Sequence, residues 1–137
     1  MIVDTSAIVA ILRGEPDADR YIEAIGEAAQ PLISAGTYIE TAIVVDANRD
    51  PVLSGRLDDL LAAGQVQVEP VTKRHAEIAR QAYRDFGKGS GHSAGLNLGD
   101  CFAYALARAT GEPLLFKGDD FGHTDVESVL EQTTQGR

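Results

Sequence analysis

Short apolar segments alternate along this chain with longer segments of helical periodicity, and this alternation is the strongest constraint on its fold. Apolar or β-branched runs predict strands at residues 1–3, 31–34, 65–71 and 113–116, with a last short strand at 125–130. Helices are predicted at residues 5–14, 18–29, 37–49, 52–64, 73–87 and 98–111. Strands separated by helices indicate a parallel sheet that is covered on both faces and joined by right-handed crossovers.

The size of the chain limits its organisation. Its 137 residues, 44% of them hydrophobic, suit a single domain over residues 1–137 with a substantial core. No apolar run is long enough for a membrane span, and the N-terminus lacks a signal-peptide pattern, so we expect a cytoplasmic protein. One cysteine excludes an internal disulfide bond, and the sequence has no Cys/His cluster that suggests zinc.

Four acidic residues lie where predicted strands end or helices begin. Asp4 follows the first strand, Glu40 comes just after the second, and Asp119 follows the fourth. Asp100 begins the helix after the glycine-rich loop 87–95. Ligand sites in open α/β sheets form outside the carboxyl ends of the strands, so we expect these acids to share one edge of the sheet.

Acids that share a cleft repel each other unless a cation is present. Oxygen ligands without sulfur or imidazole favour Mg²⁺, or Mn²⁺. An ionised carboxylate in an apolar setting, such as that of Asp4, is costly unless it is compensated. The sequence therefore predicts that a divalent cation, bound jointly by the acids, compensates Asp4.

The same acids also suit ordinary local structure. Asp4 fits an N-cap, and Asp100 fits the first turn of a helix, where negative charge is favourable. Thr37 and Glu40 fit the two ends of a capping box, and Asp119 fits a turn. Capping is the better explanation of any single acid, whereas the set of four at such junctions favours a metal site.

Four segments in order resemble the PIN-domain ribonucleases and, within them, the VapC-type toxins of bacterial toxin–antitoxin pairs: MIVDTSAIVAIL, TYIETA, LNLGDCFAYALA and PLLFKGDDF. The resemblance covers nearly the whole chain. It implies a three-layer α/β/α sandwich with a central parallel sheet of four to five strands. It also implies a Mg²⁺-dependent endoribonuclease, usually a homodimer, that a VapB-type antitoxin neutralises.

Four acids match the acidic positions of that family: Asp4, Glu40, Asp100 and Asp119. The family often has Thr or Ser two residues before the fourth acid, where this chain has Lys117, and Asp120 is an alternative for that position. On this interpretation Asp4 and Asp100 bind the metal directly. The other two bind it directly, bind it through water, or orient the nucleophile. Two hydroxyl groups either reach a ligand or act as caps: those of Thr5 and Ser6.

The formal net charge of −9 argues against bulk attraction to nucleic acid. Residues 73–92 differ, because they hold five of the twelve Lys and Arg residues but only two of the twenty-one acids. Four of these cations form either a strip that faces phosphate groups or an ordinary solvated helix face: Lys73, Arg80, Arg84 and Lys88.

Two other function classes remain open from the residues. A catalytically inactive PIN-like module that only binds a protein partner would not need a metal. A phosphatase or receiver domain would accept phosphate on Asp4. The haloacid dehalogenase pattern, however, needs a second Asp where this chain has Ser6, and receiver domains usually carry the phosphorylated Asp on a middle strand. Cys101 suits packing better than nucleophilic catalysis.

Long apolar stretches predict a surface that a partner covers. They are residues 41–47 and, near the N-terminus, Ile8, Val9, Ile11 and Leu12. The expected partners are a second copy of the chain and an antitoxin whose tail offers Arg or Lys to the carboxylates.

Overall fold

A computed structural model describes residues 1–130. Four short strands form one parallel sheet in the order β3–β2–β1–β4: β1 (Ile2–Val3), β2 (Leu32–Ser34), β3 (Gln67–Glu69) and β4 (Leu114–Leu115). The helices of the described residues are α1 (Thr5–Leu12), α2 (Ala18–Glu27), α3 (Ala35–Asp46), α4 (Pro51–Ala63), α5 (Lys73–Phe86), α6 (Leu98–Thr110) and the short 3₁₀ helix η1 (Phe121–His123). None of these helices has the length and apolar character needed to cross a bilayer.

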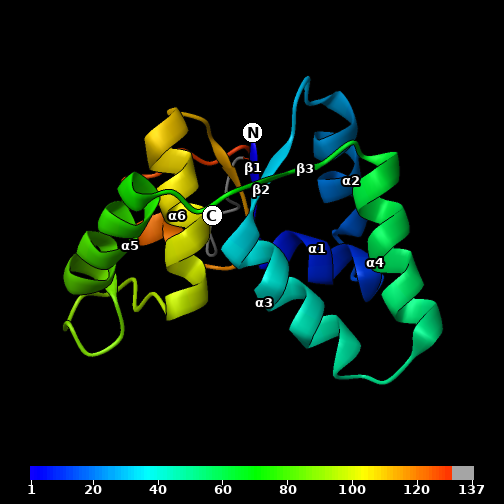
Figure 1. The fold of residues 1–137 in the computed structure, drawn as a ribbon, viewed down its shortest axis with the longest axis horizontal. Helices are drawn as coiled ribbons and strands as arrows, with labels where there is room; N and C mark the ends of the chain where they lie inside the picture. The colour runs from blue at the N-terminus through cyan, green and yellow to red at the C-terminus, as the bar shows by residue number, and fades with distance from the viewer. Residues whose placement is uncertain (131–137) are drawn as a thin grey trace.

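The sheet separates two layers of helices, with α5 and α6 on one face and α1 to α4 on the other (Figure 1). Alternate strand residues supply the two cores, as the pleat requires. Val3, Ile33 and Leu115 pack with α1 to α4, whereas Ile2 and Leu114 pack with α5 and α6. The α/β/α sandwich expected from the sequence is therefore confirmed, with four strands in its parallel sheet.

The order of the strands explains where a site can form. The chain runs from β1 outward to β2 and β3, then returns to β4 on the other side of β1. Reversing direction with right-handed crossovers moves the connecting helices to the opposite face. The carboxyl ends of β1 and β4 thus become the topological switch point, where α/β folds form ligand sites. Asp4 directly follows β1.

Two expectations from the sequence need correction. The predicted strand at 125–130 is only a single bridge, in which the Glu127 carbonyl and the Val129 N–H bond to Leu114 at 2.8 and 3.0 Å. The apolar residues of α1 do not form a partner surface, because α1 packs against the sheet and the neighbouring helices. Ile8, Ile11 and Leu12 are buried in the core, and Val9 is half-buried.

Candidate active site

Asp4 is the most buried acid of the candidate site, with 3% of its surface exposed. It caps α1, because its Oδ2 accepts the Ser6 backbone N–H at 3.0 Å and the Ser6 hydroxyl at 2.7 Å. Its Oδ1 is buried and has no hydrogen-bond partner within the described structure. The capping interpretation therefore accounts for one oxygen and leaves the other available for a ligand.

Ser6 connects Asp4 to the end of β4. Its Oγ donates to Asp4 and accepts the Lys117 backbone N–H at 2.9 Å. The Lys117 ammonium in turn contacts Glu15 and Asp17, each at 2.9 Å. Lys117 thus ties the end of β4 to the turn between α1 and α2, and Ser6 fixes the orientation of the Asp4 carboxylate rather than projecting toward a ligand.

Glu40 lies inside α3, and this position separates the two interpretations of its role. The N-cap of α3 is Ser34, which accepts the Gly36 N–H at 3.2 Å, so the alternative interpretation of Thr37 and Glu40 as a capping box is wrong. The Glu40 carboxylate instead accepts the Thr5 hydroxyl at 2.7 Å. Glu40 is therefore held across the fold by the first turn of α1, and helix capping does not explain it.

Gly99 allows the Glu40 carboxylate to approach the start of α6. A Cβ atom added at Gly99 would overlap Oε2 of Glu40 and crowd the rest of the carboxylate. Any larger residue at position 99 would consequently displace Glu40. The sequence interpretation missed this role of Gly99, because a contact between residues 59 positions apart leaves no local pattern.

Asp100 enters the site from the first turn of α6. It forms a reciprocal capping box with Asn97, in which Asn97 Oδ1 accepts the Asp100 N–H at 2.8 Å and Asp100 Oδ2 accepts the Asn97 N–H at 3.0 Å. The cap that the sequence indicated is present. Asp100 is half-buried, and its negative charge contributes to the raised pKa of Asp4, so the cap does not remove it from the acid cluster.

The electrostatics of the acids join them into one cluster. Burial raises the pKa of Asp4 to about 7, and the negative charges of Asp100 and Glu40 add to the effect against the Ser6 hydrogen bonds. Burial also raises the pKa of Asp100 to about 6, with further contributions from Asp120 and Glu40. The structure therefore brings Asp4, Glu40 and Asp100 together, as expected at the switch point.

The fourth acid is less simply placed. Asp119 and Asp120 are both exposed in the segment after β4, and the Asp119 carbonyl accepts the Gly122 N–H at 3.0 Å. The charge of Asp120 acts on Asp100. Electrostatics thus connects the alternative residue, Asp120, to the cluster, and Asp119 stays a prediction.

The donor set suits a divalent cation in its chemistry. No three His, Cys, Asp or Glu side chains in residues 1–130 already converge closely enough to hold an ion. However, the cluster combines an unpartnered buried oxygen on Asp4 with carboxylates whose pKa values are raised by burial and repulsion. A hard cation would supply the partner that Asp4 Oδ1 lacks and would reduce the repulsion between the carboxylates.

Two other features lie outside the acid cluster. Burial raises the pKa of the Cys101 thiol to about 11, so this cysteine is a packed residue as expected.

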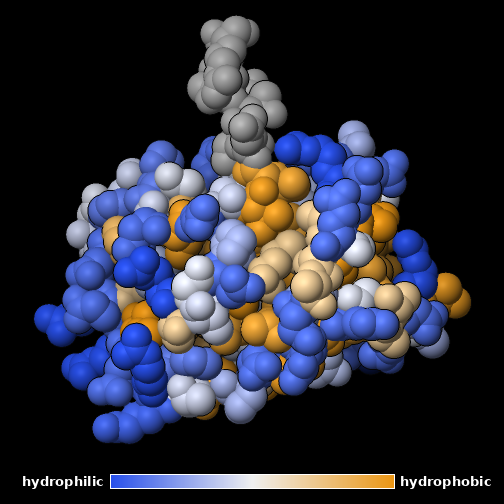
Figure 2. Space-filling view, turned by 90° about the horizontal axis from the view of Figure 1, so that it is seen from above, coloured by the Kyte–Doolittle hydropathy of each residue, from blue (hydrophilic) through white to orange (hydrophobic). Residues whose placement is uncertain are grey.

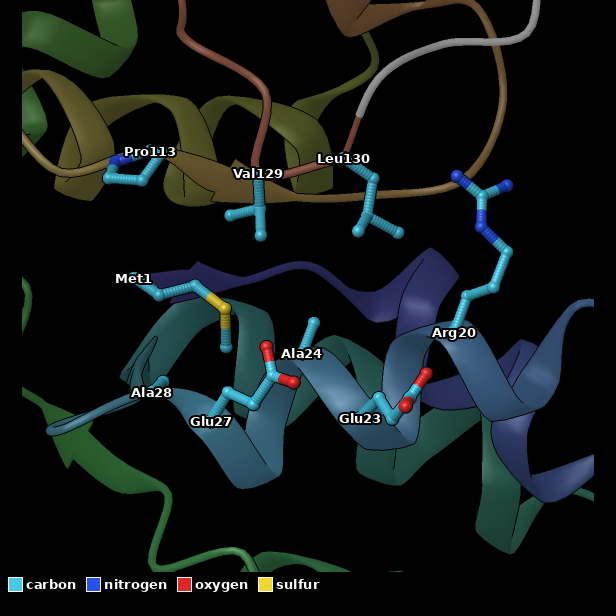
Figure 3. A pocket seen from close by; sticks show the side chains of 9 residues that line it. All are labelled: Met1, Arg20, Glu23, Ala24, Glu27, Ala28, Pro113, Val129 and Leu130. Atoms are coloured by element: carbon cyan, nitrogen blue, oxygen red, sulfur yellow. The ribbon is translucent and has the colours of Figure 1, made fainter.

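A hollow of about 400 Å³ opens at the amino edge of the sheet, between α2 and residues 113 and 129–130 (Figure 3). Seen from that edge, hydrophobic residues gather between hydrophilic flanks (Figure 2). Asp4 lies at the opposite, carboxyl edge, so this hollow does not contribute to the cluster.

Comparisons of sequence relate the chain to known proteins. A family model described as PIN domain matches residues 1–127. Ribonuclease VapC28 of Mycobacterium tuberculosis is 57% identical over 132 residues, which cover 96% of this chain and 99% of that protein. Ribonuclease VapC30 of the same species is 47% identical over 129 residues, with 94% and 98% covered.

Solved structures share the fold. The toxin VapC20 of M. tuberculosis, described as cleaving the sarcin–ricin loop, superposes with a TM-score of 0.71 at 19% identity, covering 93% of this chain and 97% of that one. A chain from a toxin–antitoxin complex of Klebsiella pneumoniae gives a TM-score of 0.65 at 19% identity, with 88% of each chain covered.

Proposed function

We propose a mechanism and partners for this chain from the premise that it belongs to the PIN-domain family and, within it, to the VapC ribonucleases, the toxins of toxin–antitoxin systems. Its proposed reaction is the Mg²⁺-dependent hydrolysis of RNA phosphodiester bonds, with Mn²⁺ as a substitute. The observation that carries the proposal is the buried, unpartnered Oδ1 of Asp4 beside Glu40 and Asp100. A carboxylate of this kind favours a cation over a purely structural cap.

In this proposal Asp4 and Asp100 hold the ion, and the fourth acid is Asp119 or its neighbour Asp120. When bound, the ion would lower the pKa of an adjacent water molecule and neutralise charge on the phosphate. Glu40, which Thr5 Oγ1 holds at 2.7 Å, orients the water that attacks phosphorus. Ser6 keeps Asp4 in the rotamer that leaves Oδ1 available.

The test is RNA cleavage by purified protein with Mg²⁺, together with calorimetric measurement of Mg²⁺ and Mn²⁺ binding. Asp4→Asn and Asp100→Asn should each abolish RNA cleavage and metal binding. Glu40→Gln should lower cleavage at least about tenfold, equivalent to roughly 1.4 kcal/mol of transition-state stabilisation. Asp59→Asn, an exposed acid on α4, is the control and should change neither. Equal metal affinity in the wild type and both Asn variants would exclude the site.

These assays, together with a test for phosphorylation of Asp4, distinguish the ribonuclease from the other two function classes. A protein–protein module without catalysis would neither bind the cation through Asp4 nor cleave RNA. A phosphatase or receiver domain would form an acyl phosphate on Asp4, which mass spectrometry detects after incubation with a phosphate donor. Cleavage that requires both Mg²⁺ and Asp4, without an acyl phosphate, supports the ribonuclease mechanism alone.

We propose a second copy of the chain as a partner on the exposed side of α3. Three large apolar residues are exposed there or beside it at the start of α6: Ile39 at 57%, Ile43 at 64% and Leu98 at 68%. They line a groove of about 440 Å³, to which Phe102 and Glu40 also contribute. Exposed apolar surface of this kind favours an interface, and a homodimer through α3 would bring two acid clusters near each other.

The second proposed partner is a VapB-type antitoxin whose tail covers the acid cluster. An Arg or Lys of the tail would pair with the carboxylates and compete with the cation. Added Mg²⁺ should therefore weaken inhibition, and truncation of the tail should abolish it. Inhibition that responds to neither change would exclude this mode of neutralisation.

The proposed domain is the whole chain, residues 1–137, supported by a family match over residues 1–127. An enzyme that acts on cellular RNA is proposed to work in the cytoplasm. Expression of the chain with fractionation of the cells tests this location.

A further inference from the structure

The loop that joins α5 to α6 brings a lysine to the edge of the acid cluster. The Lys88 N–H donates to the Leu96 carbonyl at 2.8 Å, and the Leu96 N–H donates to the Phe86 carbonyl at 2.8 Å. Leu96 is fully buried, and the next residue, Asn97, is the N-cap of α6. The backbone of Lys88 is therefore fixed beside the helix start that carries Asp100. The loop runs from the end of α5 to the start of α6 (Figure 1).

Side chains within the loop hold it in this arrangement. The Ser90 hydroxyl donates to the Gly87 carbonyl at 2.6 Å, and the Ala94 N–H donates to Nδ1 of His92 at 3.0 Å. The His92 ring also packs edge-on against Phe86, with centroids 4.9 Å apart. The loop thus presents Lys88 on an ordered backbone, which lowers the entropic cost of binding a ligand.

Lys88 is exposed, and its charge has no ion-pair partner within residues 1–130. Asp85, a nearby acid of α5, is bound instead by Gln81, whose side-chain amide donates to both Asp85 carboxylate oxygens at 3.1 Å. Lys117 differs, because Glu15 and Asp17 occupy its ammonium. The positive charge of Lys88 acts on the acid cluster, because it lowers the pKa of Asp100, whereas the negative charges of Asp120 and Glu40 raise it.

We propose that Lys88 binds a phosphate group of the RNA strand at the edge of the acid cluster and so positions the substrate for cleavage. This inference rests on the proposed ribonuclease function. Carboxylates and a net charge of −9 repel a phosphate chain, so a cation at the rim is needed to admit it. Arg84 and Arg80 precede Lys88 at intervals of four residues, and neither has an ion-pair partner in the described structure. Lys88 lies beyond the end of α5, after the extended Gly87, so helical spacing does not align it with the two arginines, and the proposal rests on Lys88 alone.

The test compares Lys88→Gln with Arg56→Gln, which removes the same charge from an exposed position of α4. Binding is measured without divalent cation, by fluorescence anisotropy of a labelled single-stranded RNA of mixed sequence. Cleavage of the same RNA is measured with Mg²⁺. Lys88→Gln should raise Kd and KM by about fivefold to tenfold, more than it changes kcat. It should also reduce the slope of log Kd against log salt by about 0.7.

Lys88→Arg should restore binding and the salt slope, because either cation can pair with a phosphate. Arg56→Gln should leave Kd, KM and the slope at their wild-type values.

If Lys88→Gln behaves like Arg56→Gln while the wild type cleaves RNA, Lys88 has no role in binding and the ribonuclease function stands. If the wild type binds RNA through Lys88 but never cleaves it with Mg²⁺, the proposed function fails and the phosphate contact stands. A wild type that does neither excludes both.

Discussion

At the scale of single residues, Asp4 unites two roles that the sequence presents as alternatives. Its Oδ2 caps α1 through Ser6, and its Oδ1 is buried without a partner. Asp100 behaves similarly, because its capping box with Asn97 leaves it half-buried beside the other acids. A cap that fixes a carboxylate in one rotamer also prepares it to bind a ligand.

Gly99 provides a prediction at this scale. Gly99→Ala should lower RNA cleavage at least about tenfold, because the new methyl group displaces the Glu40 carboxylate. Stability should be unchanged or higher by up to about 1 kcal/mol, since Ala favours a helix and the flexible end of Glu40 can move. Cleavage assays and urea unfolding measure the two effects.

Gly55→Ala in α4, where a Cβ meets nothing within 4 Å, is the control and should keep full activity. Full activity of Gly99→Ala would show that the position of Glu40 does not matter.

At the scale of secondary-structure elements, the contact between α3 and α6 sets the distance between Glu40 and Asp100. Gly36 in the first turn of α3 lies directly against the ring of Phe102 in α6, which a Cβ at position 36 would overlap. The absence of a side chain at Gly36 therefore lets two helices from opposite sides of the sheet edge approach each other.

Gly36→Ala should destabilise the protein by about 1–3 kcal/mol, because a rigid aromatic ring must shift to admit the methyl group. Urea unfolding measures the loss. The second substitution Phe102→Leu should recover part of it, since contacting residues are not additive. Gly26→Ala, at an open position of α2, is the matched control and should stabilise slightly. Equal effects at positions 36 and 26 would contradict close packing of α3 on α6.

At the scale of the whole molecule, the clustered acids make folding depend on pH and metal. The pKa of Asp4 rises from 3.8 to about 7 on folding, and that of Asp100 rises to about 6. Between pH 5 and pH 8 the folded state therefore holds protons that the unfolded chain has released. The free energy of unfolding must then fall as pH rises through this range.

We expect the metal-free protein to lose on the order of 2–4 kcal/mol of stability between pH 5 and pH 8. Chemical unfolding at each pH in the presence of a chelator measures this slope. Asp4→Asn should flatten the slope and be more stable than the wild type at pH 8. Saturating Mg²⁺ should restore wild-type stability at pH 8 without affecting Asp4→Asn. A wild type whose stability rises with pH over this range would contradict the buried acid cluster.

The exposed apolar side of α3 predicts the assembly of the molecule. The wild type should be a dimer by light scattering at micromolar concentration. Ile43→Asp should convert it to a monomer, because burying an unpaired charge in an interface is costly. Val52→Asp, at an exposed apolar position of α4, is the control and should leave the dimer intact. A monomeric wild type, or a dimer insensitive to Ile43→Asp, would exclude this interface.

The order and type of the four strands and six α-helices could be predicted from the sequence, because periodicity, caps and β-branched runs are local properties. Asp4 and Asp100 could be proposed as site residues from the sequence because one follows a buried strand and the other lies in the first turn of a helix. Glu40 was also proposed, although it lies in the middle of α3. Three features could be learned only from the three-dimensional fold: the hydrogen bond from Thr5 to Glu40, the effect of Asp120 on Asp100, and the single bridge formed by residues 125–130. The fold likewise decided that Ile8 is buried whereas Ile43 is exposed. These outcomes depend on which crossovers cover which face of the sheet, and contacts between residues far apart in the chain leave no periodic signal.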